Sequence, residues 1–111
     1  MTIDQLKSFG ANTEEGLGRC LGREDFYLRM VRAGVTDAHF EALEKHLAEH
    51  DLKGAFEDAH ALKGVMATLA LTPIAQPVSE MTEHLRAGEE MDYAPLLKTV
   101  LTKRAELAAL L

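Results

Sequence analysis

The sequence predicts an all-α fold, an antiparallel (up-and-down) four-helix bundle with extra short N-terminal helices. Apolar residues recur at spacings of three and four along nearly the whole chain, with little strict alternation, and this period is typical of amphipathic helices. Glycines and prolines divide the chain into segments of helical length. Four of these segments are substantial and are joined by short connections, which favours an antiparallel bundle.

Short helices are expected in the first third of the chain. One covers about residues 2–9, and a second covers about residues 12–22, where an asparagine followed three places later by a glutamate can cap its start. A third covers about residues 24–33, and we expect Gly34 to end it.

Four longer helices account for the rest. The first, second and fourth cover about residues 37–51, 52–70 and 92–110, and aspartates stand where the first and fourth begin. The third has two alternative starts. It begins at Thr72 and Pro73 and is kinked by Pro77, or it begins at Pro77 itself, because an internal proline removes a backbone hydrogen bond.

Length and composition indicate one ordinary globular domain, residues 1–111. The chain is 47% apolar and 27% charged, values that fit neither a disordered nor a membrane protein. Cys20 is the only cysteine, so an internal disulfide is excluded and a reducing compartment is favoured. The sequence has no signal-type start and no run of about 18 apolar residues. We therefore expect a cytoplasmic protein that does not bind a membrane.

The charge pattern argues against nucleic acid as a partner. The formal net charge is −6 and the pI is near 5.3, and the lysines and arginines are scattered along the chain. Nucleic-acid binding depends on clustered cations that neutralise phosphates. We therefore expect no nucleic-acid partner.

The predicted helix over residues 52–70 has an apolar face and an outward histidine. The apolar face consists of residues at alternating spacings of three and four: Leu52, Ala55, Ala59, Leu62, Met66 and Leu69. At roughly 100° per residue, His60 lies about 130° from the centre of this face. We therefore expect the imidazole of His60 to point towards solvent.

Small residues follow His60 on the outer side of this helix. Gly64 follows it by one turn and Ala67 by two turns, while Phe56 precedes it by one turn. A glycine inside a helix costs about 1 kcal/mol relative to alanine, so Gly64 indicates close approach of a partner. Lys63 can reach a group attached to the imidazole. A phosphate is the natural candidate, because a neutral imidazole is nucleophilic and the lysine offsets the added negative charge.

The stretch His60-Ala61-Leu62-Lys63-Gly64, with Leu69 following it, resembles the signature of histidine-containing phosphotransfer (HPt) domains. The flanking segments that also resemble this family are His50-Asp51-Leu52, Asp25-Phe26-Tyr27-Leu28 and Glu80 to Ala87. Together they cover about Leu6 to Leu101. The chain departs from the family at Ala70, where glycine is common, and at Thr68, where small polar residues vary, and both departures concern packing at the helix end.

The resemblance implies a phosphoprotein that acts as a carrier in a two-component phosphorelay. Nε2 of His60 would accept a phosphoryl group from the aspartyl phosphate of a receiver domain and pass it to another receiver. Lys63 would stabilise the phosphate charge, Gly64 would allow close approach, and Phe56 and Ala67 would contact the docked receiver. The implied partners are response-regulator receiver domains and hybrid sensor kinases. The receiver would supply Mg²⁺, and the chain would need no cofactor of its own.

The sequence lacks the features of an enzyme that uses ATP. It has no phosphate-binding loop of the GxxxxGK[ST] kind and is too short to add a kinase catalytic domain. We therefore expect a phosphocarrier that does not make its own phosphohistidine. No dimer seam is evident in the pattern of apolar residues, so we also expect a monomer.

Two alternatives stay open. The first is a helical adaptor that binds receiver domains without being phosphorylated, although His60, Lys63 and Gly64 together argue against it. The second is a zinc site, because His46 and His50 have the H-x-x-E-H spelling of one zinc-peptidase class. A third ligand for zinc is not apparent, and both histidines also suit a helix C-terminus, where cations interact favourably with the dipole. We expect no metal site.

Overall fold

Seven α-helices and no strand make up the computed structural model, which describes residues 1–111. The all-α prediction is confirmed. In chain order the helices are α1 (Ile3–Phe9), α2 (Thr13–Arg19), α3 (Glu24–Val35), α4 (His39–Ala48), α5 (Leu52–Thr68), α6 (Thr72–Arg86) and α7 (Ala94–Ala108). The molecule is elongated, with extents of 41 × 23 × 19 Å. No helix is sufficiently long and apolar to serve as a membrane span.

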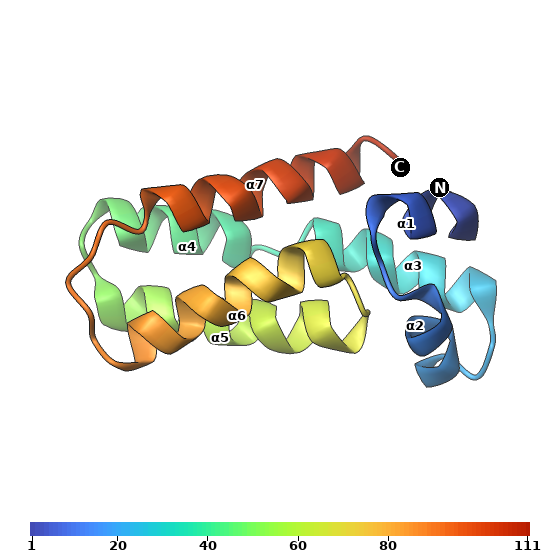
Figure 1. The fold of residues 1–111 in the computed structure, drawn as a ribbon, viewed down its shortest axis with the longest axis horizontal. Coiled ribbons are helices and arrows are strands. Elements are labelled where there is room, and N and C mark those ends of the chain that lie inside the picture. Colours follow the sequence, from blue (N-terminus) through green and yellow to red (C-terminus); the bar gives the residue numbers. More distant parts are fainter.

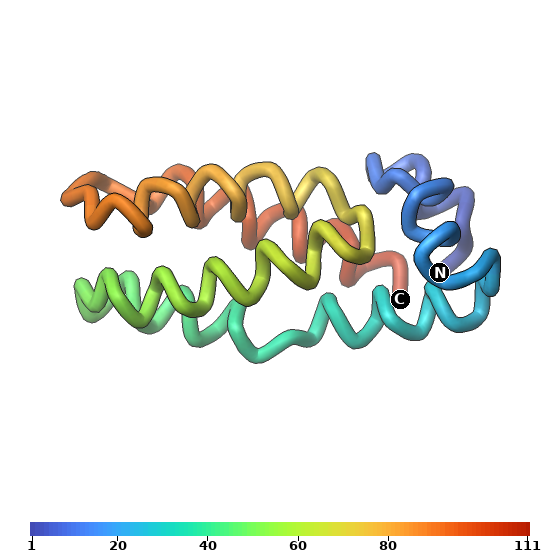
Figure 2. Tube along the Cα trace, turned by 90° about the horizontal axis from the view of Figure 1, so that it is seen from below, coloured from blue at the N-terminus to red at the C-terminus, as the bar shows by residue number.

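Helices α4 to α7 form the body of the molecule. Consecutive helices in this body run in opposite directions, so that α4 and α6 run one way and α5 and α7 the other (Figure 1). Helix α5 packs chiefly against α4 and α6, and α7 packs against α6 and α3. Helix α3 leads into α4, while α1 and α2 lie at one end of the bundle, where both chain termini are also found (Figures 1 and 2).

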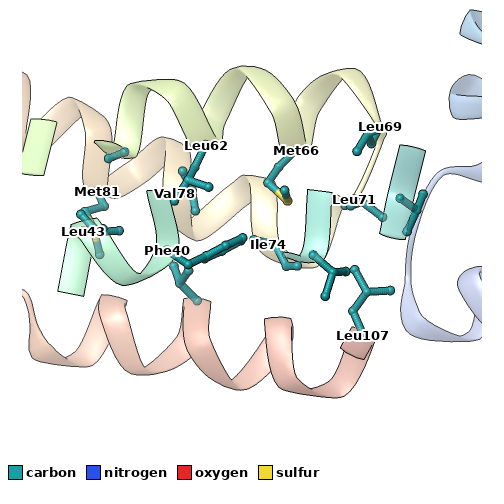
Figure 3. Close-up of a cluster of buried hydrophobic side chains, with 14 of the residues drawn as sticks. Phe40, Leu43, Leu62, Met66, Leu69, Leu71, Ile74, Val78, Met81 and Leu107 are labelled. Atoms are coloured by element: carbon teal, nitrogen blue, oxygen red, sulfur yellow. The ribbon is translucent and has the colours of Figure 1, made fainter. Parts of the chain in front are cut away.

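The core lies between these helices and fixes how α5 is rotated. Figure 3 shows side chains from α4, α5, α6 and α7 pointing towards one another, including Phe40, Leu62, Met66, Val78 and Leu107, all of them fully buried. Burying a side chain of this size contributes about 1.5–3 kcal/mol. The predicted apolar face of α5 is confirmed except at its first residue, Leu52, which is only half-buried. With this face turned inward, the opposite side of α5 faces solvent.

Aspartates stand at or just before the start of three helices, but only Asp51 is an N-cap. The N-caps of α4 and α7 are Ala38 and Tyr93, so the predicted helix starts at Asp37 and Asp92 need correction. The side-chain oxygens of the three aspartates accept hydrogen bonds from backbone N–H groups one to three residues into each helix, and the pairs are Asp37 with His39 at 2.8 Å, Asp51 with Gly54 at 2.9 Å and Asp92 with Ala94 at 3.0 Å. The bond from Gly54 fixes the first turn of α5. The position of every later residue on that helix follows from this start.

One further predicted boundary needs correction, and the structure decides between the two alternatives for another. Helix α3 continues through Gly34 to Val35, because Gly34 allows close packing there. A Cβ atom on Gly34 would lie 2.8 Å from Leu69 Cδ1, so the missing side chain brings α3 against α5. Helix α6 begins at Thr72 with Pro77 inside it, so a start at Pro77 is wrong. Proline suits the first turn of a helix, and the start at Thr72 uses Pro73 in that way.

The C-terminus of α5 has a strained residue. The helix ends at Thr68, and Ala70 then adopts a φ of +57°. The Leu71 N–H donates to the Met66 carbonyl oxygen at 2.9 Å and closes the helix end. A left-handed conformation costs an alanine roughly 1 kcal/mol or more compared with glycine, so Ala70 reduces the stability of the fold.

Candidate functional site

His60 lies near the middle of α5 and is exposed to solvent, as the sequence predicts. Its imidazole stacks on the ring of Phe56, with a centroid separation of 5.5 Å and an interplanar angle of 8°. Stacked aromatic rings at this separation attract each other. The Phe56 ring covers one face of the imidazole and holds its orientation, while the exposed ring remains accessible to a reacting group.

The helix surface beyond His60 is open. A Cβ atom on Gly64 would meet no other atom within 4 Å, whereas one on Gly34 or Gly54 would come within 3.0 Å of a neighbouring side chain. Packing inside the molecule therefore explains Gly34 and Gly54 but does not explain Gly64. Ala67 is also exposed, so on the C-terminal side of His60 the outer face of α5 carries only small residues at these two positions.

Lys63 takes part in an ionic cluster that joins α5 to α6. Its Nζ atom lies 3.3 Å from Glu83 Oε1, and Arg86 Nε lies 3.4 Å from Glu83 Oε2. The guanidinium of Arg86 in turn lies over the Phe56 ring, 5.1 Å from its centroid. The hydrogen bond from Lys63, together with the charge of Arg86, holds the pKa of the Glu83 carboxyl below its ordinary value. Sequence reasoning missed Glu83 and Arg86, because nothing in the spacing along α5 indicates which residues of α6 face it.

An apolar groove of about 470 Å³ adjoins Gly64. It runs between α3 and α5, and its lining includes Phe26, Met30 and Ala33 from α3 and Gly64, Val65 and Thr68 from α5. One wall is held by Arg19 of α2, whose guanidinium donates hydrogen bonds to the carbonyl oxygens of Ala67 and Thr68 at 2.6 and 2.9 Å. The open surface at Gly64 is thus continuous with a recess beside it.

The two histidines of the H-x-x-E-H stretch do not converge on one site. His46 Nδ1 lies 2.5 Å from Oδ2 of the buried Asp58, and this hydrogen bond is the main cause of the raised pKa of His46. His50 instead lies 2.8 Å from Glu90 and has a φ of +58°. No group of three or more His, Cys, Asp or Glu side chains is placed to hold a metal ion. The zinc alternative therefore has no ligand set, and Asp58 is a partner of His46 that the sequence did not indicate.

The remaining histidines distinguish His60 further. Four of the five histidines in the chain lie near carboxylates, and they are His39, His46, His50 and His84. His60 has no carboxylate within salt-bridge distance and contacts the Phe56 ring instead. No ion pair ties the ring nitrogens of His60 to another side chain, so they are left available to a partner.

Comparison with known families gives one match. The model of the Hpt domain matches residues 35–111, which is more than half of the chain. The matched segment includes α4 to α7 and all five candidate residues of the outer face of α5. It begins later than the resemblance seen in the sequence, so α1, α2 and all of α3 except Val35 lie outside it, together with the segment Asp25-Phe26-Tyr27-Leu28. No curated protein and no solved structure matches the chain.

Proposed function

The chain belongs to the Hpt domain family, and from this we propose that it carries phosphoryl groups on His60 between receiver domains of a two-component phosphorelay. The observation that carries the proposal is the set of contacts around the His60 side chain. His60 is the one histidine without a carboxylate neighbour, on an exposed helix face beside a glycine that nothing inside the molecule explains.

The transfer step follows from the chemistry of imidazole. The Nε2 lone pair of His60 forms the P–N bond while the P–O bond to the donor aspartate breaks, and the electron pair stays on the released carboxylate. Nδ1 keeps its proton, so the ring carries the positive charge that balances the step. Transfer to the acceptor receiver is the reverse reaction on a second aspartate. Such transfers depend on positioning and on charge stabilisation, and we expect the receiver to hold the Mg²⁺ that the reaction needs.

Each remaining residue of the outer face has a proposed role. Lys63 makes a charge-assisted contact with the phosphoryl oxygens. Gly64 lets the receiver's active site approach His60, while Phe56 orients the imidazole and, with Ala67, contacts the receiver. The proposed partners are response-regulator receiver domains and hybrid sensor kinases. A monomeric state and a cytoplasmic location stay predictions from the sequence.

The test is phosphoryl transfer without ATP. The chain is incubated with several phosphorylated receiver domains and Mg²⁺, and acid-labile phosphate is followed on the wild type, on His60→Gln and on the control His84→Gln. His84 lies on α6 and contacts Glu89 at 3.0 Å, so it tests for unspecific histidine labelling.

We expect label on the wild type and on His84→Gln and none on His60→Gln. Binding of a receiver without label on the wild type would favour the adaptor. Absence of both label and binding would refute the proposal.

A further inference from the structure

Resting on the proposed function, we infer that Glu83 is a positioning residue whose carboxylate competes with the phosphoryl group on His60 for Lys63. In the unmodified chain Glu83 holds Lys63. After transfer to His60 the lysine leaves this carboxylate for the phosphoryl oxygens. Glu83 thereby limits how strongly the phosphohistidine is stabilised and keeps its phosphoryl group transferable.

The geometry supports an exchange of partners by Lys63. Its Nζ atom is 3.3 Å from Glu83 Oε1, and its side chain starts from the same turn of α5 as His60, three residues away. Residues at this spacing are neighbours on a helix surface. A long lysine side chain on that turn can therefore contact either the carboxylate on α6 or a group attached to the imidazole.

Arg86 keeps the competing carboxylate in place. It contacts the second oxygen of Glu83, with 3.4 Å between Arg86 Nε and Glu83 Oε2, and its guanidinium rests on the Phe56 ring that also stacks on His60. With one oxygen held by Arg86, the other oxygen stays directed at Lys63. The low pKa of Glu83 means that this carboxylate is charged at neutral pH.

The size of the effect follows from the exposure of the pair. The side chains of Lys63 and Glu83 are 36% and 57% exposed, and exposed ion pairs make small contributions to stability. Removing the charge of Glu83 removes the pair from the unmodified chain only, because the phosphorylated chain has already given it up. The equilibrium between phosphohistidine and aspartyl phosphate should therefore shift towards phosphohistidine by about two- to fivefold.

The experiment measures this equilibrium in variants of the full chain. The wild type and the variants Glu83→Gln and Glu80→Gln are each mixed with one phosphorylated receiver and Mg²⁺, and acid-labile phosphate on both proteins is quantified at equilibrium. Glu80 is the matched control because it lies one turn earlier on α6, is 61% exposed and does not contact Lys63. The same substitution at Glu83 is repeated in a Lys63→Gln background. Surface changes of this kind leave folding nearly unchanged.

We expect a two- to fivefold rise in the phosphohistidine share for Glu83→Gln, about no change for Glu80→Gln, and no effect of Glu83→Gln once Lys63 is Gln. An equal shift in the Glu80 variant would overturn the inference in favour of general charge repulsion. A shift that persists without Lys63 would overturn it as well. If the wild type takes no label, the proposed function is refuted and this inference with it. That outcome differs from failure of the inference alone, in which the wild type is labelled but Glu83→Gln does not behave as expected.

Discussion

Replacing Gly64 by alanine should stabilise the fold and slow phosphotransfer at the same time. Alanine is favoured over glycine inside a helix by about 0.8–1.0 kcal/mol, and the added methyl group would meet no atom within 4 Å. Unfolding entropy is about 2.1 cal/mol/K per residue. Over 111 residues a gain of about 1 kcal/mol therefore raises the melting temperature by about 4 °C.

The same methyl group would intrude on a docked receiver. Overfilling a well-packed contact costs about 1–3 kcal/mol, which corresponds to about a 5- to 150-fold lower rate of transfer at limiting receiver concentration. Thermal unfolding followed by circular dichroism gives the first quantity, and the initial rate of label transfer gives the second. Gly64→Gln should show similar stability and a still lower rate.

A matched control is Gly18→Ala. Gly18 is also helical and exposed, and a Cβ atom there meets nothing within 4 Å, so its replacement should leave the transfer rate unchanged. A wild-type rate of label transfer in Gly64→Ala would refute close approach of the receiver at Gly64. A lower melting temperature would instead show that Gly64 serves packing within the chain.

Two further predictions concern stability. Because the hydrogen bond to Asp58 raises the pKa of His46 above 6.5, the folded chain holds this proton more tightly than the unfolded chain. The contribution of this proton to the free energy of unfolding is fully present below about pH 6.5, and it is lost as the pH rises through the raised pKa of His46. For the wild type, the urea concentration at the midpoint of unfolding should fall as the pH is raised from about 6 to 9. An equal fall in His46→Gln would show that His46 is not the cause. Ala70→Gly should raise the free energy of unfolding by about 1 kcal/mol, because glycine adopts the left-handed conformation without strain. The control Ala105→Gly, in the exposed interior of α7, should lower it by about 1 kcal/mol. A lower free energy of unfolding in both variants would refute the strain at Ala70.

Much of the fold could be predicted because helical periodicity is a local property. The spacing of apolar residues along α5 determines which side turns inward, and the buried state of Ala59, Leu62 and Met66 confirms that side. Glycine was a poorer guide. Gly34 was expected to end a helix but instead brings two helices together, and both uses of glycine look the same in a sequence.

The candidate site was predictable only where its residues share one helix. His60 and Gly64 lie on α5, so their common outward face follows from helix geometry alone. Glu83 comes from α6, and its contact with Lys63 depends on how two helices are rotated and shifted against each other. Asp58 was missed for a related reason. A buried carboxylate needs a partner, and its partner His46 lies on the neighbouring helix α4, which the spacing along α5 does not indicate.

On the proposed function, the ion pair between Lys63 and Glu83 bears on the direction in which phosphoryl groups flow. A site that strongly favoured the phosphorylated imidazole would act as a sink for phosphoryl groups, and one that strongly favoured the bare imidazole would act as a source, whatever its partners do. By the inference above, Glu83 alters this balance only about two- to fivefold. Net flow then runs from the receiver population that is more highly phosphorylated to the one that is less so, by mass action. A change in the abundance of two receivers could reverse the flow with no change in this protein.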